Sequence, residues 1–171
     1  MLPLHHPGAR KNPIVCDYTK QGFPAVTFYN VDDASGASFT MADINLFTIE
    51  LSGRSEHVSA VRRAMRILAK EEGLSPDAGD DLCLAVGEAC ANAVEHGEQD
   101  CRIHVRARRS GRDIVIDVDS AGEYSPSSVA TMPETDAEGG RGRALMHALT
   151  DRVEYITQTG RTIVRLVKRI F

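Results

Sequence analysis

The stretch DDLCLAVGEACANAVEHG, residues 80–97, combines an apolar stripe and a row of polar side chains at the spacing of one helix. Its apolar positions recur every three or four residues, which predicts a buried helix face. They are Leu82, Val86, Ala89 and Ala93. Glu88 and Asn92, followed by Glu95 or His96, are also three or four residues apart. These residues therefore share a second face, with about 6 Å of axial rise for each step of four.

The pairing of Glu88 with Asn92 has two interpretations. Polar groups beside a core are costly unless they are bonded, and an amide beside a carboxylate is the kind of pair that holds a hydrated cation. Against this, an E-x-x-x-N spacing is common by chance and is more typical of two surface residues in helical contact. The pair alone therefore does not indicate a site.

A second helix is predicted just before this one. Ser55 is a suitable N-cap, Glu56 suits the first turn, and Gly73 offers a C-terminal stop. Ser75 and Pro76 then open the next helix. One face of the first helix is basic and consists of Arg62, Arg63, Arg66 and Lys70. Such a face is usually just solvated, but it could also meet an acidic partner.

Strands are predicted on either side of these helices. Residues 44–51, INLFTIEL, alternate as a strand does, and residues 102–119 and 151–170 each predict a hairpin, around RSGR and QTGR. A short helix over residues 144–149 follows a glycine-rich GGRG segment. The order of elements predicts an α+β fold, with helices on one face of a mixed, mostly antiparallel sheet.

Length and charge limit the classes of protein. The 171 residues, 42% of them apolar, suffice for one sizeable core, which we assign to residues 44–171. Residues 1–43 are expected to be an extension, poorly ordered or adding one strand through residues 25–31. The net charge of −4 argues against direct binding to nucleic acid or to an anionic membrane. No segment reaches the roughly 20 apolar residues of a membrane span.

The cysteines indicate the cellular compartment in which the protein is found. Cys16, Cys83, Cys90 and Cys101 form no C-x-x-C pair. Two of them lie in the helix of residues 80–97, where a free thiol behaves as a small hydrophobic group. We therefore expect a cytoplasmic protein.

Glycines before the short helix predict a phosphate site. Gly139, Gly140 and Gly142 lie in EGGRGRALMHAL, where backbone N–H groups at a helix N-terminus can bind phosphate. The alternative is a flexible hinge. Two nucleotide motifs are excluded, because the chain lacks G-x-x-x-x-G-K-[ST], and a G-x-G-x-x-G would need a glycine at Leu145.

The second hairpin strand ends in VIDVDSAGEYSP, with Asp119 near its end. A carboxylate there can accept a hydrogen bond from an exocyclic amine such as that of adenine. Taken alone, Asp119 is more typical of a strand-ending Asp in a turn.

In this order the motifs resemble those of the small serine kinases that act as anti-sigma factors. Their ATPase fold is shared with histidine kinases, gyrase and mismatch-repair ATPases. The resemblance covers residues 47–169: two helices over residues 54–97, an adenine box in DVDSAGEYSP, a lid end in GGRGRALMHALTDRVEY and a last strand in GRTIVRLVKR. It implies a two-layer α/β sandwich of the Bergerat (GHKL, histidine kinase-like ATPase) type.

The resemblance also implies residue roles. Glu88 matches the general base for the attacking serine hydroxyl, and Asn92 matches the ligand of Mg²⁺. Asp119 would receive the adenine amine, and Thr162 would assist it through water. The full set of implied nucleotide contacts is Asn92, His96, Gly97, Asp119, Gly122, Gly139, Gly140, Gly142 and Thr162.

The adenine box departs from the family pattern D-x-G-x-G-F. Counted from Asp119, the two glycine positions hold Ala121 and Glu123, Gly122 lies between them, and Tyr124 replaces Phe.

The function implied is an anti-sigma factor that uses ATP and Mg²⁺. It would sequester a sigma factor and phosphorylate a serine of an anti-sigma factor antagonist. Dimers are common in the family, so a homodimer stays open. The alternative is a non-catalytic module of the same fold that binds its partner and binds ATP poorly or only as a switch. Phosphate transfer separates the two.

Overall fold

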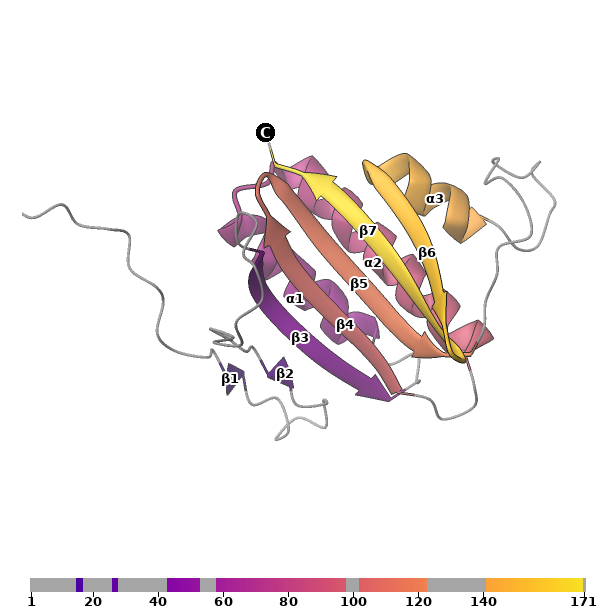
Figure 1. Ribbon diagram of the computed structural model, residues 1–171. Coiled ribbons are helices and arrows are strands. Elements are labelled where there is room, and N and C mark those ends of the chain that lie inside the picture. The colour runs from indigo at the N-terminus through magenta and orange to yellow at the C-terminus, as the bar shows by residue number, and fades with distance from the viewer. Residues whose placement is uncertain are drawn as a thin grey trace, which may run out of the picture.

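The main sheet of the protein has five strands, seen in the computed structural model of Figure 1. The structure describes residues 15–16, 26–27, 43–52, 58–97, 102–122 and 141–170. The strands are β3 (Ile44–Ser52), β4 (Arg102–Ser110), β5 (Asp113–Ala121), β6 (Arg152–Gln158) and β7 (Arg161–Arg169). The helices are α1 (Val58–Glu71), α2 (Pro76–His96) and α3 (Arg141–Leu149). The strand order in the sheet is β3-β4-β5-β7-β6.

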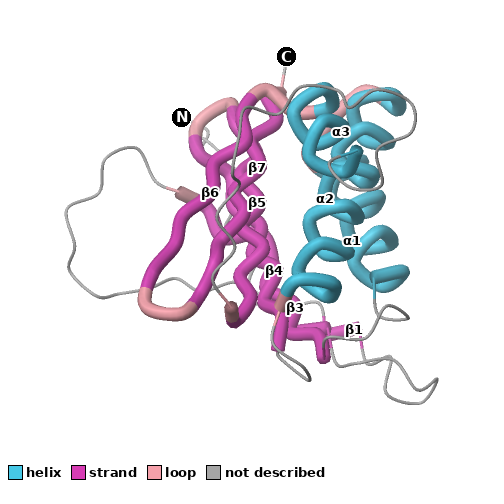
Figure 2. The backbone as a smooth tube through the Cα atoms, turned by 90° about the vertical axis from the view of Figure 1, so that its right-hand side faces the viewer, coloured by secondary structure: helices cyan, strands magenta, loops and turns pink. Residues whose placement is uncertain are grey.

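The helices and the sheet form two layers. Figure 2 shows all three helices on one face of the sheet, which confirms the predicted two-layer α/β sandwich. The sheet was expected to be mixed, but each neighbouring pair in it is antiparallel. The reason is that β5 and β6, which α3 connects, run in the same direction but have β7 between them. The crossover therefore creates no parallel pair.

The predicted stripe of α2 lies in the core between the layers. All four of its predicted apolar residues are buried: Leu82, Val86, Ala89 and Ala93. The cysteines of this helix, Cys83 and Cys90, are buried free thiols. Because burial disfavours the thiolate, it raises the pKa of Cys90 to about 12.

Strand β3 contains a bulge that sequence alternation does not reveal. Its register against β4 shifts between Asn45 and Phe47. Phe47, Ile49 and Leu51 are buried, whereas Ile44 is exposed. Because of the extra residue at position 46, Ile44 opposite Arg109 and Ile49 opposite Val105 lie on the same face of the sheet, which strict alternation would not give.

The helix ends follow their sequence signals. Gly73, with φ of 74°, ends α1 as the N–H of Leu74 donates to the Ala69 carbonyl at 2.9 Å. This is a Schellman motif, which requires the left-handed conformation that glycine adopts easily. Ser75 caps α2, because its hydroxyl accepts a hydrogen bond from the N–H of Ala78 at 3.2 Å.

Both hairpins form as predicted. The β4–β5 turn has Gly111 at its first central position, with φ of 60°. The β6–β7 turn places Thr159 and Gly160 at φ of 41° and 74°. Positive φ at both central positions suits the right-handed twist of the flanking strands. Helix α3 begins at Arg141, earlier than the predicted residue 144, so Gly142 lies in its first turn.

The N-terminal region contributes two short strands. Val15–Cys16 (β1) pairs antiparallel with Val26–Thr27 (β2) in a separate two-stranded sheet. Residues 25–31 therefore do not add a strand to the main sheet within the described residues. The predicted N-cap at Ser55 lies outside the described residues. Among the helices described, none is long and apolar enough to cross a membrane.

Candidate functional site

The polar face of α2 meets the start of α3 at one point. A Cβ built on Gly142 would lie 2.7 Å from Oε2 of Glu88 and 3.6 Å from Oδ1 of Asn92. The first turn of α3 therefore touches both residues. A side chain at position 142 would therefore require the Glu88 carboxylate to shift. Within the described residues, no hydrogen bond or ion pair engages the side chain of Glu88 or of Asn92.

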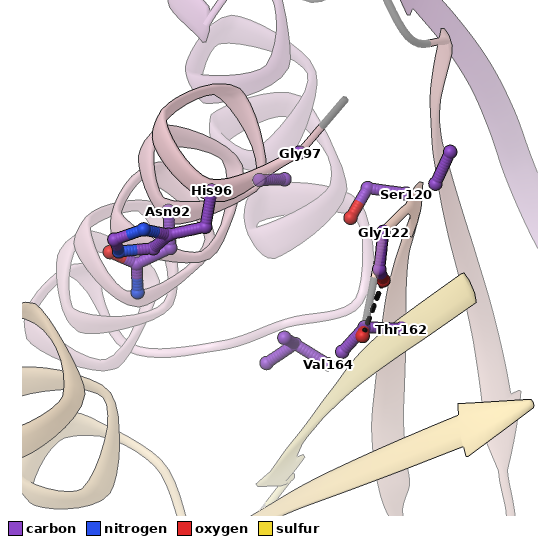
Figure 3. Close-up of a pocket in the computed structure, with 9 residues that line it drawn as sticks. Asn92, His96, Gly97, Ser120, Gly122, Thr162 and Val164 are labelled. Carbon is purple, nitrogen blue, oxygen red and sulfur yellow. Dashed lines mark hydrogen bonds between the residues drawn. The ribbon is translucent and has the colours of Figure 1, made fainter. Parts of the chain in front are cut away.

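A pocket opens next to this contact, between the end of α2 and the strands β5 and β7 (Figure 3). Asn92, which lies against Gly142, is part of its wall and so links the pocket to Glu88. The complete lining is Asn92, Ala93, His96, Gly97, Ser120, Ala121, Gly122, Thr162 and Val164. Five of the predicted contact residues thus share one pocket: Asn92, His96, Gly97, Gly122 and Thr162.

Thr162 and Gly122 hold the strand side of the pocket. The Thr162 hydroxyl donates to the Gly122 carbonyl at 2.8 Å, and the Gly122 N–H donates to the Gly160 carbonyl at 2.8 Å. Gly122 has φ of 104°, a conformation that other residues rarely adopt. These two bonds fix the turn after β5 against the β6–β7 hairpin, as the dashed line in Figure 3 shows for the first of them.

Asp119 does not lie in this pocket. Its carboxylate accepts a hydrogen bond from Nε of Arg161 at 2.9 Å. Along β5 the buried residues Ile114, Ile116 and Val118 face the helices. Residue 119 therefore points to the opposite face of the sheet. The prediction that Asp119 receives the adenine amine does not agree with this placement.

The face to which Asp119 belongs carries a row of ion pairs. Asp117 receives two hydrogen bonds from Arg165, at 2.7 and 3.0 Å. This hydrogen bonding raises the pKa of Arg165 above its usual value. Asp113 pairs with Arg169 at 3.3 Å. Asp119 and its arginine extend the same pattern, which explains this carboxylate without any ligand.

Ser120 takes the place in the pocket that was expected of Asp119. It follows Ile116 and Val118 in the two-residue period of β5, and it is only 7% exposed. Figure 3 shows its hydroxyl directed toward α2. Thr162 is its direct partner across the strands, so both hydroxyl residues face the same side. Counted from Ser120, the family pattern D-x-G fits as S-A-G, with Gly122 at the first glycine position.

The sequence contains a signal that identifies Ser120 as the pocket residue. Alternation through Ile114, Ile116 and Val118 predicts that position 120, and not position 119, continues the inward face. Asp119, with the more conspicuous side chain, is the immediate neighbour of that position.

Polar groups lie at both ends of the pocket. At one end Gly142 leaves a backbone surface against Glu88, and the Asn92 amide oxygen is a suitable ligand for Mg²⁺. At the other end lies Ser120, a buried residue whose hydroxyl has no hydrogen-bond partner among the described residues. Gly139 and Gly140 lie outside the described residues. No group of three or more His, Cys, Asp or Glu side chains with metal-site geometry occurs in the described part of the chain.

Comparisons with known proteins agree with the fold. The model of the histidine kinase-like ATPase domain family matches residues 51–168. The serine-protein kinase RsbW of Bacillus pumilus is 29% identical over 135 residues, covering 70% of this chain and 83% of the relative. RsbW of Listeria monocytogenes is 31% identical over 130 residues, covering 68% of this chain and 83% of the relative.

A solved structure shows the same fold. The RsbU and RsbW domains of a Mycobacterium tuberculosis protein superpose with a TM-score of 0.54 at 22% identity, over 71% of this chain. This chain spans about a third, 32%, of that longer structure. The family match covers more than half of the chain. The chain therefore belongs to the histidine kinase-like ATPase domain family, alongside the RsbW serine-protein kinases to which it is similar.

Proposed function

We propose that this protein is an anti-sigma factor that uses ATP to phosphorylate a serine of an anti-sigma factor antagonist. It would also sequester a sigma factor in the cytoplasm. Residues 44–171 would be the ATPase domain and residues 1–43 an extension. Membership of the ATPase family and similarity to serine-protein kinases support this class of activity. One observation carries the proposal: Glu88 and Asn92 meet at Gly142, beside a pocket between α2 and the strands β5 and β7.

Glu88 would act as the general base. Its carboxylate has no hydrogen-bond partner among the described residues, so it is available to take the proton of a serine hydroxyl. That serine oxygen forms the new bond to the terminal phosphorus of ATP, and ADP leaves. Phosphoryl transfer depends chiefly on positioning and on charge neutralisation.

Asn92 would hold the metal. Its amide oxygen lies at the junction of the pocket and the Glu88 contact. Mg²⁺, when bound, neutralises charge on the phosphate oxygens. The chain would then contribute three things at one place: a proton acceptor, a metal ligand, and a helix N-terminus without a side chain at Gly142.

A second function is a regulatory module that binds its partners without transferring phosphate. Ser120 favours it, because a neutral hydroxyl replaces the charged acceptor expected at the base end of the pocket. Hydrogen bonds to charged groups are stronger than neutral ones, so a pocket without that charge holds adenine less tightly.

The test combines capture of partner proteins with an assay of phosphate transfer to them. The tagged protein is incubated with native cell extract, with and without ATP and Mg²⁺, and the captured proteins are then exposed to ATP labelled at its terminal phosphate. Label on a serine of a small captured protein supports the kinase. Capture of a sigma factor without any label supports the binding module. Failure to capture a sigma factor or an antagonist in both conditions contradicts the anti-sigma role in either form.

A further inference from the structure

We infer that Ser120 is the residue that reads the purine base, and that with serine there the pocket accepts guanine as well as adenine nucleotides. This inference rests on the proposed nucleotide site and adds to it the class of base. It concerns the strand end of the pocket, where Ser120 and Thr162 face the same side.

Ser120 is built into the pocket. It is 7% exposed and lies on the helix-facing side of β5. No hydrogen bond engages its hydroxyl within the described residues. The Thr162 hydroxyl, in contrast, donates its proton to the Gly122 carbonyl at 2.8 Å. Ser120 therefore offers the donor that is not committed to the backbone.

The chemistry of serine differs from that of aspartate at this point. An ionised carboxylate only accepts hydrogen bonds, whereas a hydroxyl donates one and accepts others. Adenine presents an amine at position 6, and guanine presents a carbonyl oxygen there. A carboxylate therefore binds the amine and repels the carbonyl oxygen. A serine hydroxyl can accept from the amine or, after rotation about its C–O bond, donate to the carbonyl.

Asp119 cannot select between adenine and guanine in the pocket, because its side chain lies on the opposite face of the sheet. Its carboxylate is bonded to Arg161 on the far face of the sheet. Among the described residues that line the pocket, none carries a carboxylate. The base end therefore lacks the fixed negative charge that would exclude guanine.

The experiment measures binding and not transfer. Dissociation constants for ATP and GTP, each with Mg²⁺, are determined by calorimetry for the wild-type protein, Ser120→Asp and Ser120→Ala. Asp119→Asn is the matched control, because it removes a carboxylate one residue away on the other face. Measurement at about pH 8 keeps the introduced carboxylate ionised, since burial raises its pKa.

We expect the wild-type affinities for ATP and GTP to lie within about 10-fold of each other. Ser120→Asp should tighten ATP and weaken GTP by about 10-fold each, the size of one charge-assisted hydrogen bond. Ser120→Ala should weaken both nucleotides to a similar extent, and Asp119→Asn should change neither. The wild-type ratio tests the inference even if the aspartate variant folds poorly.

Two outcomes overturn the inference. A wild-type preference for ATP above about 100-fold shows that another group selects the base. Loss of ATP binding in Asp119→Asn shows that Asp119 is the anchor after all. In both cases phosphate transfer can remain intact, so the proposed function survives. If neither nucleotide binds the wild type or Ser120→Asp, the inference fails together with the proposed use of ATP.

Discussion

Gly142 of α3 lies directly against the carboxylate of Glu88 in α2. A Cβ at residue 142 would be 2.7 Å from Oε2 of Glu88, closer than any real contact of that kind. The glycine lies in the first turn of α3, and the glutamate lies in α2, the longest helix among the described residues. Their contact therefore couples the position of α3 to the position of the proposed base.

Replacing Gly142 with alanine should displace that base without unfolding the protein. The far end of Glu88 is flexible and can rotate away from the new methyl group. Alanine also favours a helix by up to about 1 kcal/mol over glycine. We expect the melting temperature to hold or rise, while phosphate transfer falls about 10- to 100-fold, as small misplacements of catalytic groups do. Kinetics and thermal unfolding are measured on the same preparation.

A double variant distinguishes displacement of Glu88 from other effects of the Gly142→Ala substitution. If Gly142→Ala acts only through Glu88, adding it to Glu88→Gln should slow transfer no further. An additive loss would mean that residue 142 acts on the phosphates by itself. Unchanged transfer in the single variant would contradict the coupling altogether.

Strong local signals explain why much of the fold was predictable. The caps at Gly73 and Ser75 and the two hairpin turns each depend on short-range chemistry, and the structure confirms them. The bulge in β3 does not depend on such signals. It is set by pairing with β4, so alternation alone does not show that Ile44 and Ile49 share a face.

The site was predictable in its helix and, on the strand side, at Gly122 and Thr162 but not at the end of β5. Asn92 and His96 follow from helical spacing, and the pocket contains both. At the end of β5, one residue decides the face, and Asp119 is chemically more conspicuous than Ser120. Alternation favoured Ser120, but only the paired sheet shows that Asp119 is bonded to Arg161. The contact of Gly142 with Glu88 depends on tertiary packing, which sequence spacing does not encode.

The buried thiol of Cys90 predicts a loss of stability at alkaline pH. Burial raises its pKa from 9.0 to about 12. Below the lower value the thiol is protonated in both folded and unfolded states and does not affect the balance. Between the two values only the unfolded state ionises, so the free energy of unfolding falls as the pH rises. At about pH 10.5 the loss is about 2 kcal/mol.

Denaturant unfolding of the wild type and of Cys90→Ala measures this effect. The drop between about pH 8 and pH 10.5 should be smaller in the alanine variant by the amount given above. Equal drops would contradict the assignment. In the native protein at about pH 8, the thiol should also resist alkylation until the chain is unfolded.

The basic face of α1 should speed partner association. Arg63 and Arg66 are exposed on this helix, and opposite charges steer encounter. Arg62 is left unchanged, because its guanidinium packs over Gly87, 2.6 Å from where a Cβ would be. We expect Arg63→Glu to slow association with an acidic partner and to flatten its dependence on salt.

Stopped-flow association with the captured sigma factor checks this prediction. Arg112→Glu is the control, since it makes the same charge change at an exposed residue of the β4–β5 turn, outside α1. Equal slowing in both variants would indicate an effect of net charge. Unchanged rates in Arg63→Glu would leave the basic face as a solvated surface.

A substitution at Glu88 distinguishes the kinase function from the binding-module function. Glu88→Gln keeps the shape of the side chain and removes the proton acceptor. Transfer to the antagonist should fall about 10²- to 10⁴-fold, as expected for loss of a general base. Nucleotide and sigma factor affinities should stay close to wild type, because the proposed nucleotide contacts lie at Asn92 and in the pocket beyond it.

The matched control is Glu95→Gln, one carboxylate further along the same helix and exposed. It makes an identical chemical change away from Gly142, so it should leave both transfer and affinities unchanged. If the two variants behave alike, Glu88 is only a polar residue at the edge of the helix. If the wild type transfers no phosphate while it still binds its partners, the binding module is the correct function. A general base requires that Glu88→Gln loses phosphate transfer, that Glu95→Gln does not, and that both variants keep their nucleotide and sigma factor affinities. The reason is that a general base acts on the proton of the serine hydroxyl and does not contribute to binding.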